Sequence, residues 1–304
     1  MFRKIITSIS RFIKMIFRLS PEKRLRDSLD FVIDPYTSLK NNSLPTLAFR
    51  TLRYRCAGRG FSLTRNEKSI LALHGKHQGQ RAFVIGNGPS LNKCDLTLLK
   101  DEVTFGVNSI FLNYENMGFT PTYYFVEDIF VAEDRAEQIN AFRGPTKFFG
   151  NYLRYCLSND PDTLWLNVCV LYKEYPDFPH FSRNAARMLW VGGTVTYLCL
   201  QMAYYMGFTE IYMIGFDHSY HIPKSNVDIG RHGRDMLSTQ DDPNHFHPDY
   251  FGKGYRWHHP QVDRMEKAFR KAKQAFEADG RSIYNATVGG NLEVFERIGY
   301  KNLF

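Results

Sequence analysis

The chain has 304 residues, of which 43% are apolar and 23% are charged, proportions that are ordinary for a globular protein. This length is sufficient for one large α/β domain, or two small ones, with a real core. Five cysteines stand far apart without a CxxC pair, which argues against a disulfide framework and indicates a reducing compartment. No apolar run approaches the roughly 18 residues of a membrane span, and charges interrupt the first 20 residues, so neither a span nor a signal peptide is expected.

The net charge is +8, and much of the excess lies at the N-terminus. Residues 1–26 contain eight lysines and arginines against one acid, Glu22. Within residues 1–20, large apolar side chains recur at helical spacing, with Arg and Lys on or beside the other face. This pattern predicts an amphipathic basic helix that lies on an anionic membrane surface. The alternative is a helix packed on the body of the protein or on a second subunit.

Residues 21–79 read as a mixed region of helices and loops. From residue 80 onward, short apolar strands alternate with helices. Strands are expected at 81–86, 103–107, 122–127, 146–149, 165–171, 210–215 and 282–286. Helices are expected at 90–100, 131–141, 193–206 and 260–278. Continuous apolar strands that alternate with helices are typical of a mostly parallel sheet with helices on both faces. We therefore expect a Rossmann-like α/β domain over residues 80–304.

A glycine loop directly follows the first of these strands. It reads Gly86-Asn87-Gly88-Pro89-Ser90 and leads into a predicted helix. In an open α/β sheet, such a loop faces the ligand crevice, and its glycines let the backbone approach a phosphate at the helix start. Asn87 and Ser90 add side-chain donors. The sequence predicts a phosphate site of a nucleotide here, although a simple strand-to-helix turn has the same pattern.

A second polar loop follows the strand at 210–215. Gly192-Gly193-Thr194 opens the helix before this strand, and Asp217 emerges after it, together with His218. By the same crevice rule, Asp217 is expected on the ligand side, where it would accept ribose hydroxyls or orient a base. The alternative is that Asp217 only caps the following segment.

Residues 217–260 contain seven of the ten histidines, among many prolines and glycines. These histidines are His218, His221, His232, His245, His247, His258 and His259. Long irregular segments in compact domains are commonly lids, and the aromatic residues here argue against plain disorder, so we expect a lid at about 217–258. One histidine acting as a general base is better supported than a metal site, because the spacing specifies no ligand set.

These motifs together resemble the DUF115 family, which includes the 6-hydroxymethylpterin diphosphokinase MptE-like proteins. The resemblance covers roughly residues 80–297. The chain is also similar to the glycosyltransferase 42 sialyltransferases and to the motility-associated factor glycosyltransferases. The segments that carry it are Gly86–Leu91, Gly106–Asn108, Gly193–Val195, Gly215–Asp217 and Asn285–Glu293.

The sialyltransferase likeness implies a metal-independent transfer from a CMP-linked sugar. It implies that Gly86, Asn87, Gly88, Ser90 and Asn108 bind the nucleotide, with Thr194 and Asp217 completing the pocket. Tyr255-Arg256-Trp257-His258 looks like a lid motif in which the tyrosine contacts phosphate and the histidine is the base. His259 is adjacent and is an alternative base.

One departure from the sialyltransferase pattern leaves two types of reaction as alternatives. The chain has Glu127-Asp128 after its third strand, where the sialyltransferases have an asparagine. Two carboxylates there would repel a donor phosphate unless a cation lies between them, which favours Mg²⁺-dependent diphosphoryl transfer with Glu127 and Asp128 as ligands.

The leading hypothesis is therefore a glycosyltransferase without a cofactor, acting on a surface glycan or glycolipid acceptor. It would be cytoplasmic and peripheral at the inner face of the bacterial membrane. A Mg²⁺-dependent diphosphokinase and a non-catalytic nucleotide-binding protein are the alternatives. No nucleic acid partner is expected, and homo-oligomerisation is left open.

Overall fold

The computed structural model of the chain describes residues 44–304 except 171–178 and 231–234. The helix predicted for residues 1–20, and the rest of the chain up to residue 43, lie outside the described residues. Within the described part, no helix has both the length and the hydropathy needed to cross a bilayer.

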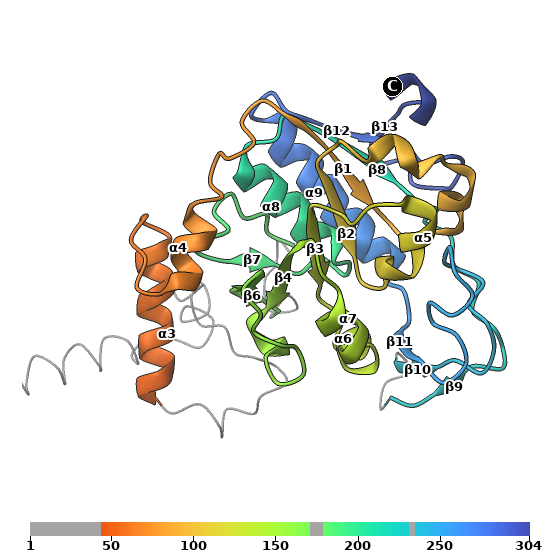
Figure 1. Cartoon of the computed structure of the whole chain (residues 1–304), viewed down its shortest axis with the longest axis horizontal. Helices are drawn as coiled ribbons and strands as arrows, with labels where there is room; N and C mark the ends of the chain where they lie inside the picture. The colour runs from red at the N-terminus through yellow and green to blue at the C-terminus, as the bar shows by residue number, and fades with distance from the viewer. Residues whose placement is uncertain (1–43, 171–178, 231–234) are drawn as a thin grey trace, which may run out of the picture.

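Eight strands form one sheet in which every neighbouring pair is parallel, in the order β13-β12-β8-β1-β2-β3-β4-β5 (Figure 1). Residues 82–85 of the central strand are fully buried, as expected for a strand covered on both faces. The predicted Rossmann-like α/β fold is confirmed. The strands are β1 (Arg81–Ile85), β2 (Thr104–Val107), β3 (Tyr123–Val126), β4 (Thr146–Gly150), β5 (Thr163–Leu166), β8 (Glu210–Ile214), β12 (Ser282–Asn285) and β13 (Glu296–Arg297).

Helices lie on both faces of this sheet. The chain runs outward from β1 to β5 and then returns to place β8 on the other side of β1. Because parallel crossovers are right-handed, connections that run in opposite directions cover opposite faces. On one face the helices α8 and α9 pack on each other, α8 on β1 and α9 on β12 (Figure 1). The α-helices are α3 (Leu44–Ala57), α4 (Arg65–Leu71), α5 (Tyr114–Met117), α6 (Ile129–Asp134), α7 (Ala136–Ala141), α8 (Thr196–Met206) and α9 (Val262–Glu277).

Two expected helices differ in the structure. The helix predicted over 90–100 is instead two 3₁₀ segments, Pro89–Lys93 and Leu96–Leu99. The carboxylate of Asp95 accepts hydrogen bonds from the Thr97 N–H (3.1 Å) and hydroxyl (2.6 Å), a local pattern that competes with helix continuation. The helix predicted over 131–141 breaks at Arg135, between α6 and α7.

The segment expected to be a lid contains a small antiparallel sheet in the order β11-β10-β9, formed by β9 (Val227–Asp228), β10 (Asp235–Leu237) and β11 (Arg256–His258). Strands of two or three residues are too short to give a hydrophobic period in the sequence. A further short pair, β6 (Val168–Cys169) and β7 (Leu189–Trp190), lies near α8.

The lid segment is anchored to the main domain by hydrogen bonds with the segments that follow β1 and β3. Asn92 donates to the Phe246 carbonyl (3.0 Å), and the Phe246 N–H donates to the Asn87 carbonyl (2.9 Å). Arg135, 2% exposed, donates to the carbonyls of Asp249 and Tyr250. The break in the helix at Arg135 thus brings a guanidinium to the lid.

Candidate functional site

The reversal of strand order between β1 and β8 brings two glycine loops together. The Gly86 N–H donates to the Ile214 carbonyl (2.8 Å), and the Gly88 N–H donates to the Gly215 carbonyl (2.9 Å). A Cβ on Gly86 would lie 2.5 Å from the Gly215 oxygen, so a side chain there is excluded. The glycines are required because two backbones approach each other here. The place where the strand order reverses, between β1 and β8, is the switch point of the sheet, and open α/β sheets form their ligand crevices at such a point.

The helix start after β1 already holds an anion, the carboxylate of Asp217. The Ser90 N–H lies 3.2 Å from both Asp217 carboxylate oxygens, and the Ser90 hydroxyl donates to Oδ2 at 2.6 Å. A Cβ on Gly88 would lie 1.9 Å from the same oxygen. In this arrangement the Ser90 N–H and hydroxyl are paired with Asp217, and the phosphate site on this loop stays a prediction. Gly88 and Ser90 receive the Asp217 carboxylate.

A cavity of about 560 Å³ opens at the carboxyl edge of the sheet, beneath the lid. Its size is typical of small-ligand sites. Ten of the residues expected to form the site line it: Gly86, Asn87, Gly88, Asn108, Glu127, Asp128, Thr194, Asp217, His258 and His259. Two do not, Ser90 and Tyr255. The ring of Tyr255 instead lies under the Arg135 guanidinium, 3.8 Å from its carbon, so a phosphate contact for Tyr255 is not supported.

Two asparagines hold unpartnered amide oxygens in the wall of the cavity. Asn87 donates to the Val107 carbonyl (3.1 Å) and the Tyr250 hydroxyl (2.9 Å), while its Oδ1 is buried without a hydrogen-bond partner. The Oδ1 of Asn108 is also buried and unpartnered. Asn108 has a φ of 49°, a left-handed conformation that non-glycine residues adopt at a cost. Buried acceptors without partners cost free energy, which points to a ligand donor that pairs with them.

Glu127 and Asp128 have different roles after β3. Asp128 caps α6, because its Oδ1 accepts from the N–H groups of Phe130 (2.8 Å) and Val131 (3.2 Å). Glu127 is only partly exposed at the cavity wall, and burial, followed by the charge of Asp128, raises its pKa to about 7 against the opposing influence of Arg264. Its carboxyl therefore titrates near neutral pH.

Magnesium is the metal that the diphosphokinase alternative implies. Glu127 supplies one carboxylate, and Asp128 retains one oxygen that its capping bonds do not use. Mg²⁺ is commonly held by one or two carboxylates together with substrate phosphates and water, and this pair fits that pattern. Over residues 44–170, 179–230 and 235–304, no three His, Cys, Asp or Glu side chains gather as a metal site of their own.

The charged lining of the cavity is mainly acidic. Six carboxyl side chains line it, namely Glu127, Asp128, Asp217, Asp235, Asp241 and Asp242. Among the described lining residues, Arg264 is the one arginine, and lysine is absent. A Cβ on Gly193 would lie 3.2 Å from the Arg264 side chain, so Arg264 lies beside the start of α8.

Sequence reasoning did not single out His245, which has the geometry of an oriented base. Its Nδ1 lies 2.7 Å from Oδ2 of Asp242, and its ring stacks on Tyr250 at 3.9 Å. Asp242 is itself held by the N–H groups of Asn244 (2.8 Å) and Phe251 (2.9 Å). A carboxylate on one ring nitrogen fixes the tautomer and leaves Nε2 basic. The Asp-x-x-His spacing was the available signal, but it is too common to identify a dyad.

His258, the expected base, is less firmly held. Its Nδ1 lies 4.0 Å from Asp235, and its ring meets Phe130 edge-on at 4.3 Å. The Nδ1 of His259 lies 3.1 Å from the neighbouring Pro260 carbonyl. His218, which also lines the cavity, has a φ of 53° and a pKa that burial lowers against the opposing charge of Glu266. His232 lies outside the described residues.

Fold and site together define a Rossmann-like α/β protein with a lidded cavity at the switch point of its parallel sheet. Within this class, the chain belongs to the MptE-like family: the family model described as 6-hydroxymethylpterin diphosphokinase MptE-like matches residues 62–223. This bears out the resemblance seen in the sequence.

Among solved structures, the MAf glycosyltransferase from Magnetospirillum magneticum AMB-1 is similar, with a TM-score of 0.47 and 15% sequence identity. The match covers 86% of this chain and 43% of that protein, so the chain spans less than half of its length. No curated protein sequence matches the chain.

Proposed function

We propose that the chain is a glycosyltransferase that moves a sugar from a CMP-linked donor to a glycan or glycolipid acceptor. One observation carries the proposal: the cavity wall is rich in hydrogen-bond acceptors. These are the carboxylates and the unpartnered amide oxygens of Asn87 and Asn108. Sugar and ribose hydroxyls, and the amino group of cytosine, are donors that satisfy such acceptors, and a transferred sugar brings more of these donors than a transferred diphosphate does.

The donor phosphate would lie at the start of α8, not on the loop after β1. Gly193, Thr194 and Thr196 line the cavity there, and Arg264 lies beside Gly193. The N-terminus of a helix and a guanidinium both attract an anion, and they lie on the same side of the cavity. The loop after β1 is a weaker candidate, because Asp217 already occupies its donors.

His245 is the favoured general base. Its Nε2 would take the proton of the acceptor hydroxyl while Asp242 stabilises the resulting imidazolium. The acceptor oxygen forms a bond to the anomeric carbon, and the bond from that carbon to the phosphate oxygen breaks. CMP leaves with the electron pair, next to Arg264. His258 and His259 remain the alternative bases, with weaker positioning.

A second candidate is a Mg²⁺-dependent diphosphoryl transfer, since the family description names a diphosphokinase. The observation that favours it is the carboxylate of Glu127 in the cavity wall beside Asp128. There, Mg²⁺ would neutralise phosphate charge. Nucleotide binding without catalysis is the third candidate.

A glycolipid acceptor lies in a membrane, and the basic composition of residues 1–20 is typical of a segment that binds an anionic membrane surface. We include in the proposal a peripheral position at the inner face of a bacterial membrane.

The test combines binding and turnover. Purified protein is mixed with CMP-sugars, CTP or ATP, with and without EDTA, and thermal stability and nucleotide release are followed. The proposal predicts stabilisation and CMP release from a CMP-sugar, both insensitive to EDTA. ATP turnover abolished by EDTA would instead establish the second candidate, and binding without turnover across a range of acceptors would leave the third.

Variants locate the base in the same assay. His245→Ala should lower kcat by about 10²–10⁴-fold, the usual contribution of a general base. His247→Ala is the matched control, because His247 belongs to the lid but does not line the cavity. Full activity in His245→Ala with a loss in His258→Ala would return the role to His258.

A further inference from the structure

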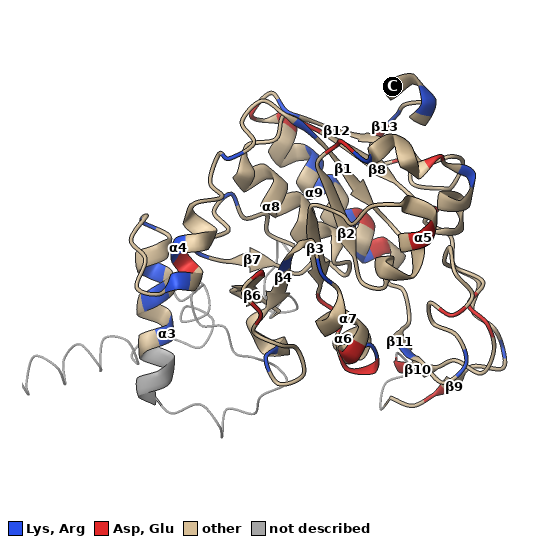
Figure 2. Ribbon diagram, in the orientation of Figure 1, with Lys and Arg blue, Asp and Glu red and all other residues tan. Residues whose placement is uncertain are grey.

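The net positive charge of the chain comes from its first quarter. Residues 1–68 contain 15 lysines and arginines and five acids, whereas the whole chain contains 39 and 31. The remaining residues therefore carry a slight negative excess. In the described part, basic residues lie along α3, the following turn and α4, at one end of the molecule (Figure 2). The acid among residues 49–68, Glu67, is 1% exposed and pairs with Arg53.

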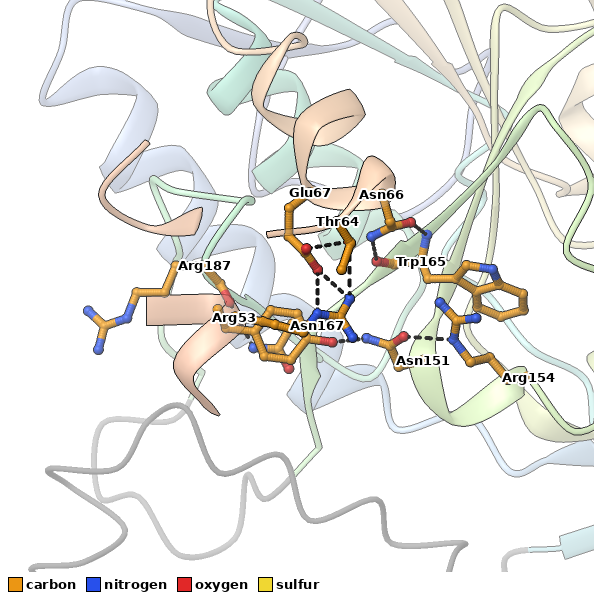
Figure 3. Close-up of polar contacts among 10 residues, drawn as sticks. Arg53, Thr64, Asn66, Glu67, Asn151, Arg154, Trp165, Asn167 and Arg187 are labelled. Carbon is orange, nitrogen blue, oxygen red and sulfur yellow. Dashed lines mark hydrogen bonds and ion pairs between the residues drawn. The ribbon is translucent and has the colours of Figure 1, made fainter. Parts of the chain in front are cut away.

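One side of α3 is fixed to the body of the protein. Arg53 donates to Glu67 (Nε to Oε1, 3.1 Å), and Asn151 of the loop after β4 donates to the hydroxyl of buried Tyr54 (Figure 3). The side-chain amide of Asn66 pairs with both backbone groups of Trp165 on the edge strand β5, at 2.8 and 2.9 Å. These contacts set which face of α3 turns outward.

Large apolar residues are exposed on α3 and in the connection that follows it. Phe49 and Leu52 are 55% and 52% exposed, and Phe61 and Leu63, in the connection to α4, are 69% and 49% exposed. Phe49 and Leu52 are three residues apart, so they share one side of the helix, away from buried Tyr54 and Ala57. We call these four residues the α3 face.

We propose that the α3 face binds the surface of an anionic lipid bilayer. The four apolar side chains would enter the interface, while the exposed guanidinium of Arg59 meets the headgroups. Leucines exposed beside the arginines favour lipid over nucleic acid, which is held by phosphate contacts and aromatic stacking. The preceding 43 residues also combine large apolar residues with arginine and lysine. This interaction surface is independent of the reaction proposed above.

The test is co-sedimentation of the full-length protein with vesicles of phosphatidylcholine, with or without phosphatidylglycerol. Binding is expected only with phosphatidylglycerol. The double variant Phe49→Ser/Phe61→Ser should weaken partitioning by at least about tenfold, and Arg59→Gln should weaken it by about fivefold. The control double variant Leu98→Ser/Tyr114→Ser removes exposed side chains elsewhere and should bind as the wild type does.

Thermal melts establish that each variant is folded. The proposal is overturned if the protein does not bind anionic vesicles, or if the α3-face variants bind as well as the wild type, which would assign binding to other residues such as 1–43. It is also overturned if those variants change only the oligomeric state or only the binding of an RNA oligonucleotide.

Discussion

Replacing Glu127 with glutamine tests whether the cavity wall holds a carboxyl that resists ionisation. Its pKa is about 7 in the folded protein against an ordinary value of 4.5. The folded state therefore keeps a proton that the unfolded state loses, so this group's contribution to stability is fully present below about pH 4.5 and is lost as the pH rises through 7. At roughly 1.4 kcal/mol per pKa unit, the ionised carboxylate costs up to about 3 kcal/mol above pH 8.

Glu127→Gln cannot ionise, so the variant should unfold like the wild type near pH 4.5. It should be more stable by about 1–3 kcal/mol near pH 8. The measurement is denaturant unfolding of both proteins over this pH range. The contributions of all other titrating groups cancel when the free energy of unfolding of the wild type is subtracted from that of the variant. Glu115→Gln is the control, since Glu115 is exposed on α5. Its difference from the wild type in free energy of unfolding should not change with pH. A variant that is less stable than the wild type near pH 8 would refute the reasoning.

Four further predictions follow from the site. The KM for a CMP-sugar should rise as the pH increases through about 7, because ionised Glu127 repels the phosphate, and Glu127→Gln should flatten this profile in steady-state assays; a KM that falls with pH would indicate a bridging Mg²⁺. Gly88→Ala should lower the free energy of unfolding by about 2 kcal/mol, because its Cβ displaces Asp217, and an unchanged Tm would contradict that contact. Arg135→Met should cost about 2–3 kcal/mol and speed proteolysis of the lid, which loses its anchor; unchanged cleavage would show that the lid is held elsewhere. Tyr250→Phe should raise the donor KM several-fold, since the hydroxyl positions Asn87, with kcat nearly unchanged.

The sheet was predictable from the sequence because its strands are continuous apolar runs. Residues 82–85 and 211–214 are buried on both faces of the sheet, and a strand buried on both faces must consist almost entirely of apolar residues. The crevice was predictable too, because Gly86 and Gly215 directly follow such strands and mark the switch point. The helix predicted over residues 90–100 was wrong for a local reason. The Asp95 carboxylate accepts a hydrogen bond from the Thr97 N–H, which interrupts the helix that the leucine spacing suggested.

The chemistry of the site was less predictable, because it depends on contacts between distant segments. Asp217 was expected to face a ligand, but its bond to Ser90 spans 127 residues and removes the donors on which the phosphate prediction rested. Tyr255 was placed at the phosphate by a motif, and the packing of Arg135 on its ring puts it elsewhere. His245 was one of seven similar histidines, and only the folded lid shows which of them has a buried carboxylate partner.

The central claim is glycosyl transfer in the cavity at the switch point. The most direct measurement is mass spectrometry of the products formed from a CMP-sugar and a glycan acceptor, with ATP present as a competing donor. The account predicts that the acceptor gains the mass of the sugar and that CMP appears in equal amount, in the wild type but not in His245→Ala. An acceptor that gains a diphosphate, with release of AMP, would contradict it.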